Sequence, residues 1–157
     1  MAGKPRILVG IPGFNGLQPG VQKAVMEMAF WSGRYMPGYD IAFEIVRKRE
    51  QFRARNLIIS AATSEHCDYL LMLDDDMLPP PDLLQRFLAH QKPVIGALYW
   101  QRGGAYHPVI MREFALQGDY KKFQFLSPYD PIITEKPGLH QVDVIGGGCM
   151  FFDVRVF

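Results

Sequence analysis

The sequence predicts an α/β domain with a mostly parallel, Rossmann-like sheet flanked by helices and a small antiparallel region in its C-terminal third. Over the first two thirds of the chain, apolar runs typical of buried strands alternate with segments of helical spacing. These runs are continuously apolar, as in strands that are covered on both faces. After Trp100, glycine and proline become frequent, and short apolar runs there suggest hairpins.

The elements of the sheet follow from these runs in chain order. An apolar run that ends at Pro12-Gly13 predicts the first strand, and Pro19 lies near the start of the first helix, where proline is tolerated. The expected strands span residues 7–11, 41–46, 69–73 and 94–99. The expected helices span residues 21–29, residues 51–65 and a segment opened by residues 79–82. The β-α-β order implies parallel strands with helices on both faces.

The C-terminal third predicts short antiparallel strands. Residues 109–111 and 123–125 have the length and composition of hairpin strands. Two further apolar runs, residues 142–145 and 150–156, flank the glycines at 146–148. These glycines would let a substrate approach the backbone closely, or would simply form a tight turn.

Composition limits the classes of function. The chain has 157 residues, which favours one domain, and its 17 basic and 16 acidic residues give a net charge of +1. That balance provides no broad positive field for nucleic acid or an anionic membrane. No apolar run approaches the roughly 20 residues of a transmembrane helix. The cysteines, Cys67 and Cys149, lie far apart beside apolar runs, which favours buried free thiols and a cytoplasmic location.

Polar side chains gather where the predicted strands end. Ligands of an open parallel sheet bind beyond the carboxyl ends of its strands, so these segments should form the site. The segments are residues 12–15, 47–49, 74–76 and 100–102.

The acidic run at the end of the third strand is the sharpest signal. Asp74, Asp75 and Asp76 follow a buried strand, where adjacent carboxylates repel each other and a divalent cation would relieve that repulsion. Oxygen ligands suit Mg²⁺ or Mn²⁺, with phosphate oxygens and water completing the shell. If the backbone stays extended, Asp74 and Asp76 share one face. The alternative is an acidic surface turn that only caps the next helix.

A second signal lies at the start of the second helix. Helix N-termini present free N–H groups, and arginine adds a bidentate donor for phosphate or a planar base. For Arg55 with Asn56 we favour a binding role, whereas Arg53 alone is more typical of a solvated helical face.

Three pieces of the chain, in this order, resemble the family-2-like glycosyltransferases of the GT-A fold. They are residues 7–12 (ILVGIP), the pair Arg55-Asn56, and residues 68–84 (DYLLMLDDDMLPPPDLL), which match the first strand, the second helix and the DxD motif of that family. Residues 94–102 and residues 142–157 are similar to the fourth strand and the later glycine-rich segment. The match covers nearly the whole chain, and its order is more specific than any single motif.

The resemblance implies one GT-A-like domain over residues 1–157. Residues 1–102 would form its nucleotide-sugar-binding half and residues 103–157 a partial acceptor-side region. The implied activity is transfer of a sugar from a UDP- or GDP-sugar to a hydroxyl of an unknown acceptor, with Mn²⁺ or Mg²⁺ as cofactor.

The same resemblance implies roles for individual residues. Asp76 would bind the metal together with Asp74, and one of Asp74 or Asp75 would contact the ribose or sugar of the donor. The turn at residues 12–15 and Arg55 would hold the base and the diphosphate. The implied donor residues are Pro12, Asn15, Arg55, Asp74 and Asp75, and the implied acceptor-side residues are Arg102, Gly147 and Gly148.

Two departures from the family pattern affect these roles. Many members have an acidic residue after the second strand that contacts uracil, whereas this chain has residues 47–49 (RKR) there and Glu50 a little later. The base could then be other than uracil, or Glu50 could take the role. The catalytic base of the family has no counterpart here, and Asp143 and Asp153 are weak candidates because they belong to strand-like runs.

The alternative function is a sugar-nucleotide-binding domain or assembly module that is catalytically incomplete. Nucleotidyltransferases use a related sheet, but they need a basic, glycine-rich loop after the first strand that residues 12–16 lack. An exposed sheet edge near the C-terminus would favour a homo-oligomer.

Overall fold

In the computed structural model, the chain forms two compact units, one of residues 1–95 with 147–157 and the other of residues 96–146. The structure describes residues 3–13, 15–101, 106–117, 120–134 and 138–157. The second unit lies between the two parts of the first along the chain. Residues 147–157, which the sequence places in the C-terminal third, therefore belong to the unit that begins at the N-terminus.

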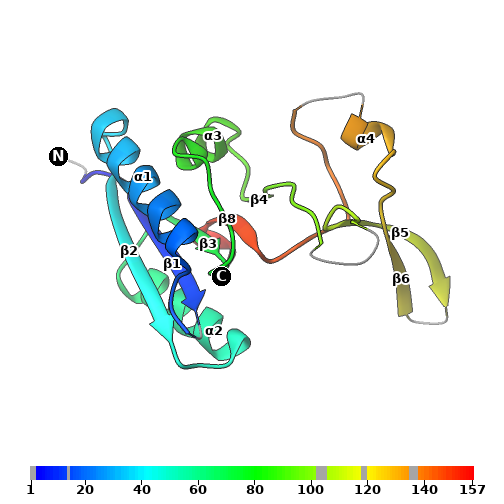
Figure 1. The fold of residues 1–157 in the computed structure, drawn as a ribbon, viewed down its shortest axis with the longest axis horizontal. Coiled ribbons are helices and arrows are strands. Elements are labelled where there is room, and N and C mark those ends of the chain that lie inside the picture. The colour runs from blue at the N-terminus through cyan, green and yellow to red at the C-terminus, as the bar shows by residue number, and fades with distance from the viewer. Residues whose placement is uncertain (1–2, 14, 102–105, 118–119, 135–137) are drawn as a thin grey trace. The chain divides into compact units, whose positions relative to one another are not determined.

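The first unit contains a mixed sheet with the strand order β2-β1-β3-β8-β4 (Figure 1). Its strands are β1 (Arg6–Gly13), β2 (Asp40–Arg47), β3 (Tyr69–Leu73), β4 (Val94–Gly96) and β8 (Cys149–Asp153). Strand β1 pairs in parallel with both β2 and β3, so the carboxyl ends of these three strands meet at one edge. Strand β8 is antiparallel to β3 and begins at that edge, since Cys149 lies opposite Leu73.

The predicted α/β class with a mostly parallel start is confirmed, but the fourth predicted strand is shorter and is not the neighbour of β3. Strand β4 ends at Gly96, and further along the predicted run the carbonyl of Tyr99 accepts a hydrogen bond from the backbone N–H of Val109 at 2.8 Å. Strand β8 lies between β3 and β4. The run predicted over residues 150–156 thus forms an inner strand of the main sheet and then a short 3-10 turn at Val154–Val156.

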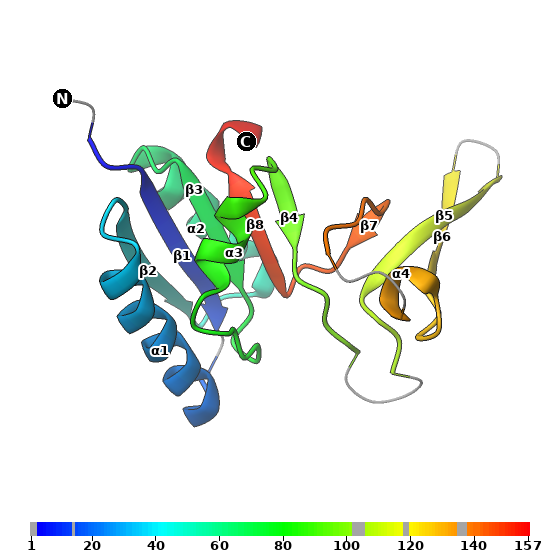
Figure 2. The same cartoon turned by 90° about the horizontal axis from the view of Figure 1, so that it is seen from above.

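Three helices cover the sheet on its two faces. They are α1 (Pro19–Tyr35), α2 (Gln51–Ser64) and α3 (Leu83–Ala89). Figure 2 shows α1 and α3 on one face and α2 on the other. Proline occupies the first position of α1, where no intrahelical N–H is lost. Helix α2 begins beside the strand ends that carry the predicted site, since Gln51 and Arg55 near its N-terminus bond to Asp74.

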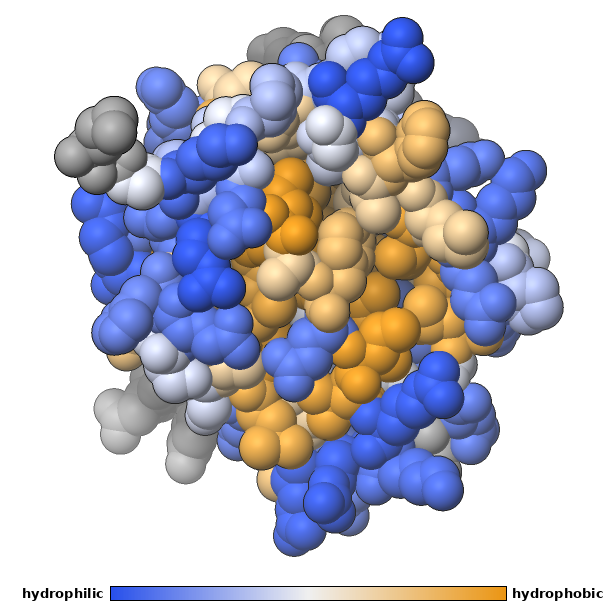
Figure 3. All heavy atoms as spheres, turned by 90° about the vertical axis from the view of Figure 1, so that its left-hand side faces the viewer, coloured by the Kyte–Doolittle hydropathy of each residue, from blue (hydrophilic) through white to orange (hydrophobic). Residues whose placement is uncertain are grey.

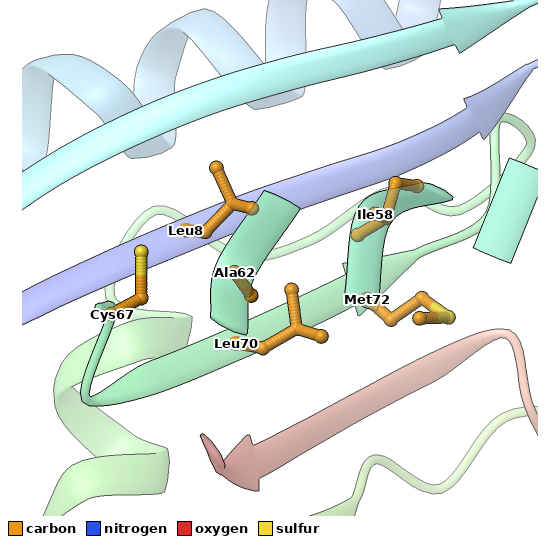
Figure 4. Close-up of a cluster of buried hydrophobic side chains, with 6 residues drawn as sticks. All are labelled: Leu8, Ile58, Ala62, Cys67, Leu70 and Met72. Carbon is orange, nitrogen blue, oxygen red and sulfur yellow. The ribbon is translucent and has the colours of Figure 1, made fainter. Parts of the chain in front are cut away.

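The core between α2 and the sheet is apolar and contains one of the cysteines (Figure 4). Its buried members are Leu8, Ile58, Ala62, Cys67, Leu70 and Met72. Burial raises the pKa of the Cys67 thiol, which favours its protonated form. Cys67 and Cys149 are both buried and are not joined in a disulfide, as the sequence predicted.

Gly10 of β1 lets α2 pack closely on the sheet. A Cβ at this position would lie 2.2 Å from Cγ2 of Ile58, which is a clash inside a closed core. We expect Gly10→Ala to lower the free energy of unfolding by about 2 kcal/mol, because α2 must move or leave its packing. Gly33→Ala is the matched control: no atom lies within 4 Å of that Cβ, and alanine in a helix gains up to about 1 kcal/mol over glycine. Urea unfolding of both variants measures the two changes, and equal stabilities would contradict the assignment.

The outward side of α1 is also apolar. Met26 and Phe30 are 71% and 78% exposed, on the side of the helix opposite the buried residues Val21 and Val25. Figure 3 shows the apolar area on this side of the molecule, with polar residues around it. Among the described residues, no helix is long and apolar enough to cross a bilayer. Helix α1 is therefore apolar on both its buried and its outward side.

The second unit contains a small antiparallel sheet with the order β6-β5-β7. Its elements are β5 (Ile110–Gln117), β6 (Tyr120–Phe125), α4 (Pro131–Thr134) and β7 (Val144–Ile145). The hairpin predicted around residues 109–111 and 123–125 is confirmed, since Met111 pairs with Phe125. Gly146 allows close packing in this unit, because a Cβ there would lie 2.1 Å from the hydroxyl of Tyr99.

Candidate functional site

The acidic segment begins where β3 ends and is held by the glycine-rich turn before β8. The backbone N–H of Asp74 donates to the carbonyl of Gly148 at 2.8 Å, and the carbonyl of Asp74 accepts from the N–H of Met77 at 3.1 Å. The chain turns at Asp75 and Asp76 instead of continuing as a strand. The alternation expected for an extended backbone, with Asp74 and Asp76 on one face, therefore does not apply.

Arg55 of α2 ties the acidic segment to the turn. Its Nη2 donates to Oδ1 of Asp74 at 2.8 Å and to the carbonyl of Gly147 at 3.1 Å. The side chains of Arg55 and Asp74 are only 28% and 19% exposed, so water screens this ion pair less than it would on the surface. Nε of Arg55 is buried and has no protein partner among the described residues. The structure thus places Arg55 next to Asp74, and the sequence assigned both residues to donor binding.

Gln51 is a member of this cluster that the sequence interpretation missed. Its Nε2 lies 3.4 Å from Oδ2 of Asp74, so both carboxylate oxygens of Asp74 accept hydrogen bonds from α2. Gln51 and Arg55 are four residues apart and hence share one face of the helix. This spacing could have identified Gln51 from the sequence, because a residue four positions before Arg55 lies on the same face of the helix.

Asp75 lies against the end of β1. A Cβ at Gly13 would be 3.3 Å from Cβ of Asp75 and 3.4 Å from its Oδ2. An alanine at position 13 would therefore fit only if Asp75 shifted slightly. The aspartates thus differ in surroundings: Asp74 is bound to α2, and Asp75 faces β1.

The donor set fits a metal ion that takes few ligands from the protein. Among the described residues, no group of three His, Cys, Asp or Glu side chains is arranged to hold one. Both oxygens of Asp74 accept hydrogen bonds from α2, and Asp74, Asp75 and Asp76 are all partly exposed at the sheet edge. Mg²⁺ and similar ions accept one or two carboxylates when substrate phosphates and water fill the other positions. The site fits that mode of binding, with Asp76 as the first candidate ligand.

The two glycines predicted for the acceptor side lie beside the donor-side residues. A Cβ at Gly147 would be 2.7 Å from Nη1 of Arg55, and Gly148 is buried with its carbonyl bonded to Asp74. Both glycines therefore have a packing reason to be small. A role toward an acceptor stays a prediction.

The other predicted donor residues lie around the end of β1. Pro12 is buried and pairs with Val46 in the sheet, and Asn15 is exposed in the loop that follows. Phe14 of the same turn and Arg102 of the predicted acceptor side lie outside the described residues. Pro12 can thus shape the loop, while Asn15 offers its side chain to solvent.

The charged residues at the end of β2 and the start of α2 have different neighbours. Glu50, which we considered for the role of the family's acidic residue, pairs with Arg53 at 3.3 Å on the exposed start of α2. This pairing agrees with the solvated face expected for Arg53. The guanidinium of Arg47 lies beside Gly16, where a Cβ would be 3.6 Å from its Cζ. Arg47 thus faces the loop that follows β1.

The carboxylates considered as a catalytic base are engaged elsewhere. Asp153 pairs with Tyr69 at the end of β3 opposite the acidic segment, and it is bonded to Arg155. This hydrogen bond holds the pKa of Asp153 below its usual range. Oδ2 of Asp143 accepts the backbone N–H of Glu113 at 2.8 Å within the second unit. The structure therefore assigns a structural contact to each and supports neither as a base.

Comparisons with known proteins agree with this architecture. A family model described as "Glycosyl transferase family 2" matches residues 34–157. The solved structure titled "Crystal Structure of A197 from STIV" matches with a TM-score of 0.55 and 14% identity, over 94% of this chain and 64% of that one. This chain thus spans less than two thirds of that neighbour's length, and the likeness concerns the fold. No curated protein matches the chain.

Proposed function

Because this chain belongs to glycosyl transferase family 2 and has the GT-A fold, we propose that it transfers a sugar from a nucleoside-diphosphate sugar to an acceptor hydroxyl. The donor would be a UDP- or GDP-sugar, and a divalent metal would assist. The observation that carries this proposal is the junction of Arg55, Asp74 and Gly147 at the carboxyl edge of the sheet.

The position of this junction supports donor binding. After β1 the chain forms β2 on one side of it and β3 on the other, so the strand order reverses between β1 and β3. Open α/β sheets bind ligands outside such a point. In this chain the ends at that point are Gly13 and the acidic segment, which meet through Asp75.

The residues at this edge of the sheet would have different roles in donor binding. Arg55 and Gln51 fix the carboxylate of Asp74, so that Asp75 and Asp76 extend from a defined turn. Asp76 would hold Mn²⁺ or Mg²⁺, which supplies Lewis-acid stabilisation of the charge on the departing diphosphate. Asp75 would contact the ribose or the sugar, since it lies on the β1 side of the turn.

A donor-binding domain without transfer activity is the second candidate. Asp143 and Asp153 are bound in structural contacts, so the described residues offer no assigned general base. A general base must come within hydrogen-bond reach of the acceptor hydroxyl. The same arrangement of residues at the sheet edge is therefore compatible with a domain that binds the donor but lacks a general base.

The experiment that tests the proposal has two stages. Calorimetry with UDP, GDP and their sugars, each with and without Mn²⁺, should show binding that requires the metal. An assay of nucleoside-diphosphate release from the bound sugar donor then separates an enzyme from a binding domain. Absence of binding for every diphosphate would contradict the proposal, and binding without release would favour the second candidate.

We also expect the protein to act in a reducing compartment such as the cytoplasm. The support is that both cysteines are buried thiols outside any disulfide. Mass spectrometry of thiols alkylated in fresh cell extracts would show both cysteines as free.

A further inference from the structure

We propose that Arg47 recognises the nucleobase of the donor and selects a base with two adjacent hydrogen-bond acceptors. Guanine and cytosine present such an edge, whereas uracil and adenine do not. The inference rests on the proposed function and specifies the class of nucleotide that the same edge binds. It starts from the place of Arg47 in the sheet and from the direction of its guanidinium.

Arg47 lies at the far end of the same ligand-binding edge. It is the last residue of β2 and is the register partner of Gly13, and a Cβ at Gly13 would lie 3.3 Å from Cβ of Asp75. From β3 to β2 the edge spans two strand spacings, roughly 10 Å. A nucleotide whose diphosphate lies at Asp76 can therefore extend along the edge and bring its base to β2.

The guanidinium of Arg47 is directed toward the loop above this edge. A Cβ at Gly16 would lie 3.6 Å from both Cζ and Nη2 of Arg47, and Gly16 has φ of 91°, which favours glycine. Arg47 forms no ion pair with the residues that the structure describes. The carboxylate next in sequence, Glu50, is paired with Arg53 instead. The donors of Arg47 are thus available to a ligand at the loop.

The chemistry of the guanidinium decides which base edge it can satisfy. Arginine carries five N–H donors in a planar fork and no acceptor. Guanine presents O6 and N7 side by side, and this pair is the common partner of arginine in nucleic-acid recognition. Cytosine presents O2 and N3 side by side. In uracil the N3–H donor lies between the acceptors O2 and O4. In adenine the amino group lies between the acceptors N1 and N7. On these edges a donor of the base would therefore face a donor of the arginine.

The test is calorimetric titration of the full chain with GDP, CDP, UDP and ADP in the presence of Mn²⁺. We expect GDP or CDP to bind roughly tenfold more tightly than UDP and ADP, since a bidentate arginine contact discriminates on that scale. Arg47→Ala should remove most of this preference while diphosphate binding persists. Arg47→Lys should do the same, because lysine keeps the charge but loses the fork. The difference between GDP and CDP identifies which of the two bases is preferred.

Three outcomes would overturn the inference, and each differs from failure of the proposed function. UDP binding as tightly as GDP and CDP would show that the base is not selected in this way. A uniform loss for all four nucleotides in Arg47→Ala would place the arginine at the phosphates. Arg49→Ala is the matched control on the same segment, and a change of preference in that variant alone would reassign the role. If none of the four diphosphates binds, the proposed function itself fails.

Discussion

Replacing Asp76 with asparagine is expected to abolish the metal-dependent part of nucleoside-diphosphate binding. The variant keeps the size of the side chain but removes the charge that would hold the cation at the end of β3. Metal stabilisation of the departing diphosphate contributes several kcal/mol, so any transfer or donor hydrolysis should fall on the order of a thousandfold. Calorimetry with Mn²⁺ and the diphosphate-release assay measure the two effects.

Glu27→Gln is the control for the charge change in Asp76→Asn. Glu27 lies on the exposed side of α1 and pairs loosely with Lys23 at 3.7 Å, so its loss should leave binding unchanged. Thermal unfolding of both variants shows whether the fold is kept. If Asp76→Asn retained metal-dependent binding while folded, Asp76 would not be a metal ligand.

Replacing Arg55 with alanine is expected to damage both stability and donor binding. Arg55 bonds to Asp74 at 2.8 Å and to the carbonyl of Gly147 at 3.1 Å. Without the guanidinium, the partly buried carboxylate of Asp74 would have no positively charged partner in this ion pair. Leaving such a charged group without its partner should lower the free energy of unfolding by about 2 kcal/mol. Urea unfolding measures this change. Nucleotide binding should weaken as well, because the turn at Asp75 and Asp76 is no longer fixed.

Two further variants separate the ion pair of Arg55 from a general effect of losing an arginine. Arg86→Ala breaks a pair with Asp82 of the same 2.8 Å length, but Arg86 is 66% exposed, and we expect little change in the free energy of unfolding because water screens this pair. The double variant Arg55→Ala/Asp74→Asn should lose less stability than the sum of its single variants, because the uncompensated carboxylate is gone. Strict additivity would mean that the two side chains do not stabilise each other.

Features that depend on neighbouring residues in the chain were predicted well from the sequence. Strand β3 has the predicted bounds of residues 69–73, and α2 ends within one residue of its prediction. Both follow from local apolar patterns, which fix strand and helix with little help from the rest of the fold. The nearness of Arg55 to Asp74 agrees with the donor-binding roles that the family resemblance implied for both residues.

Features that depend on distant pairing were missed. The position of β8 between β3 and β4 joins residues 69–73 to residues 149–153, and no local pattern indicates which strand accepts it. The sequence left open whether Asp74 to Asp76 continue the strand or form a turn, and the turn that the structure shows is held by the bond from Asp74 to Gly148. The contact of Arg47 with the loop at Gly16 likewise requires the register of β1 and β2. The sequence therefore identified the edge but not the neighbours of each side chain.

A crystal structure of the full chain grown with Mn²⁺ and GDP tests the central claim most directly. Anomalous scattering at the manganese edge locates the metal independently of any fitted side chain. We predict one peak within bonding distance of a carboxylate oxygen of Asp76 and of a diphosphate oxygen, with Arg55 still bound to Asp74. A nucleotide bound elsewhere, or a metal that contacts none of Asp74, Asp75 and Asp76, would contradict the account.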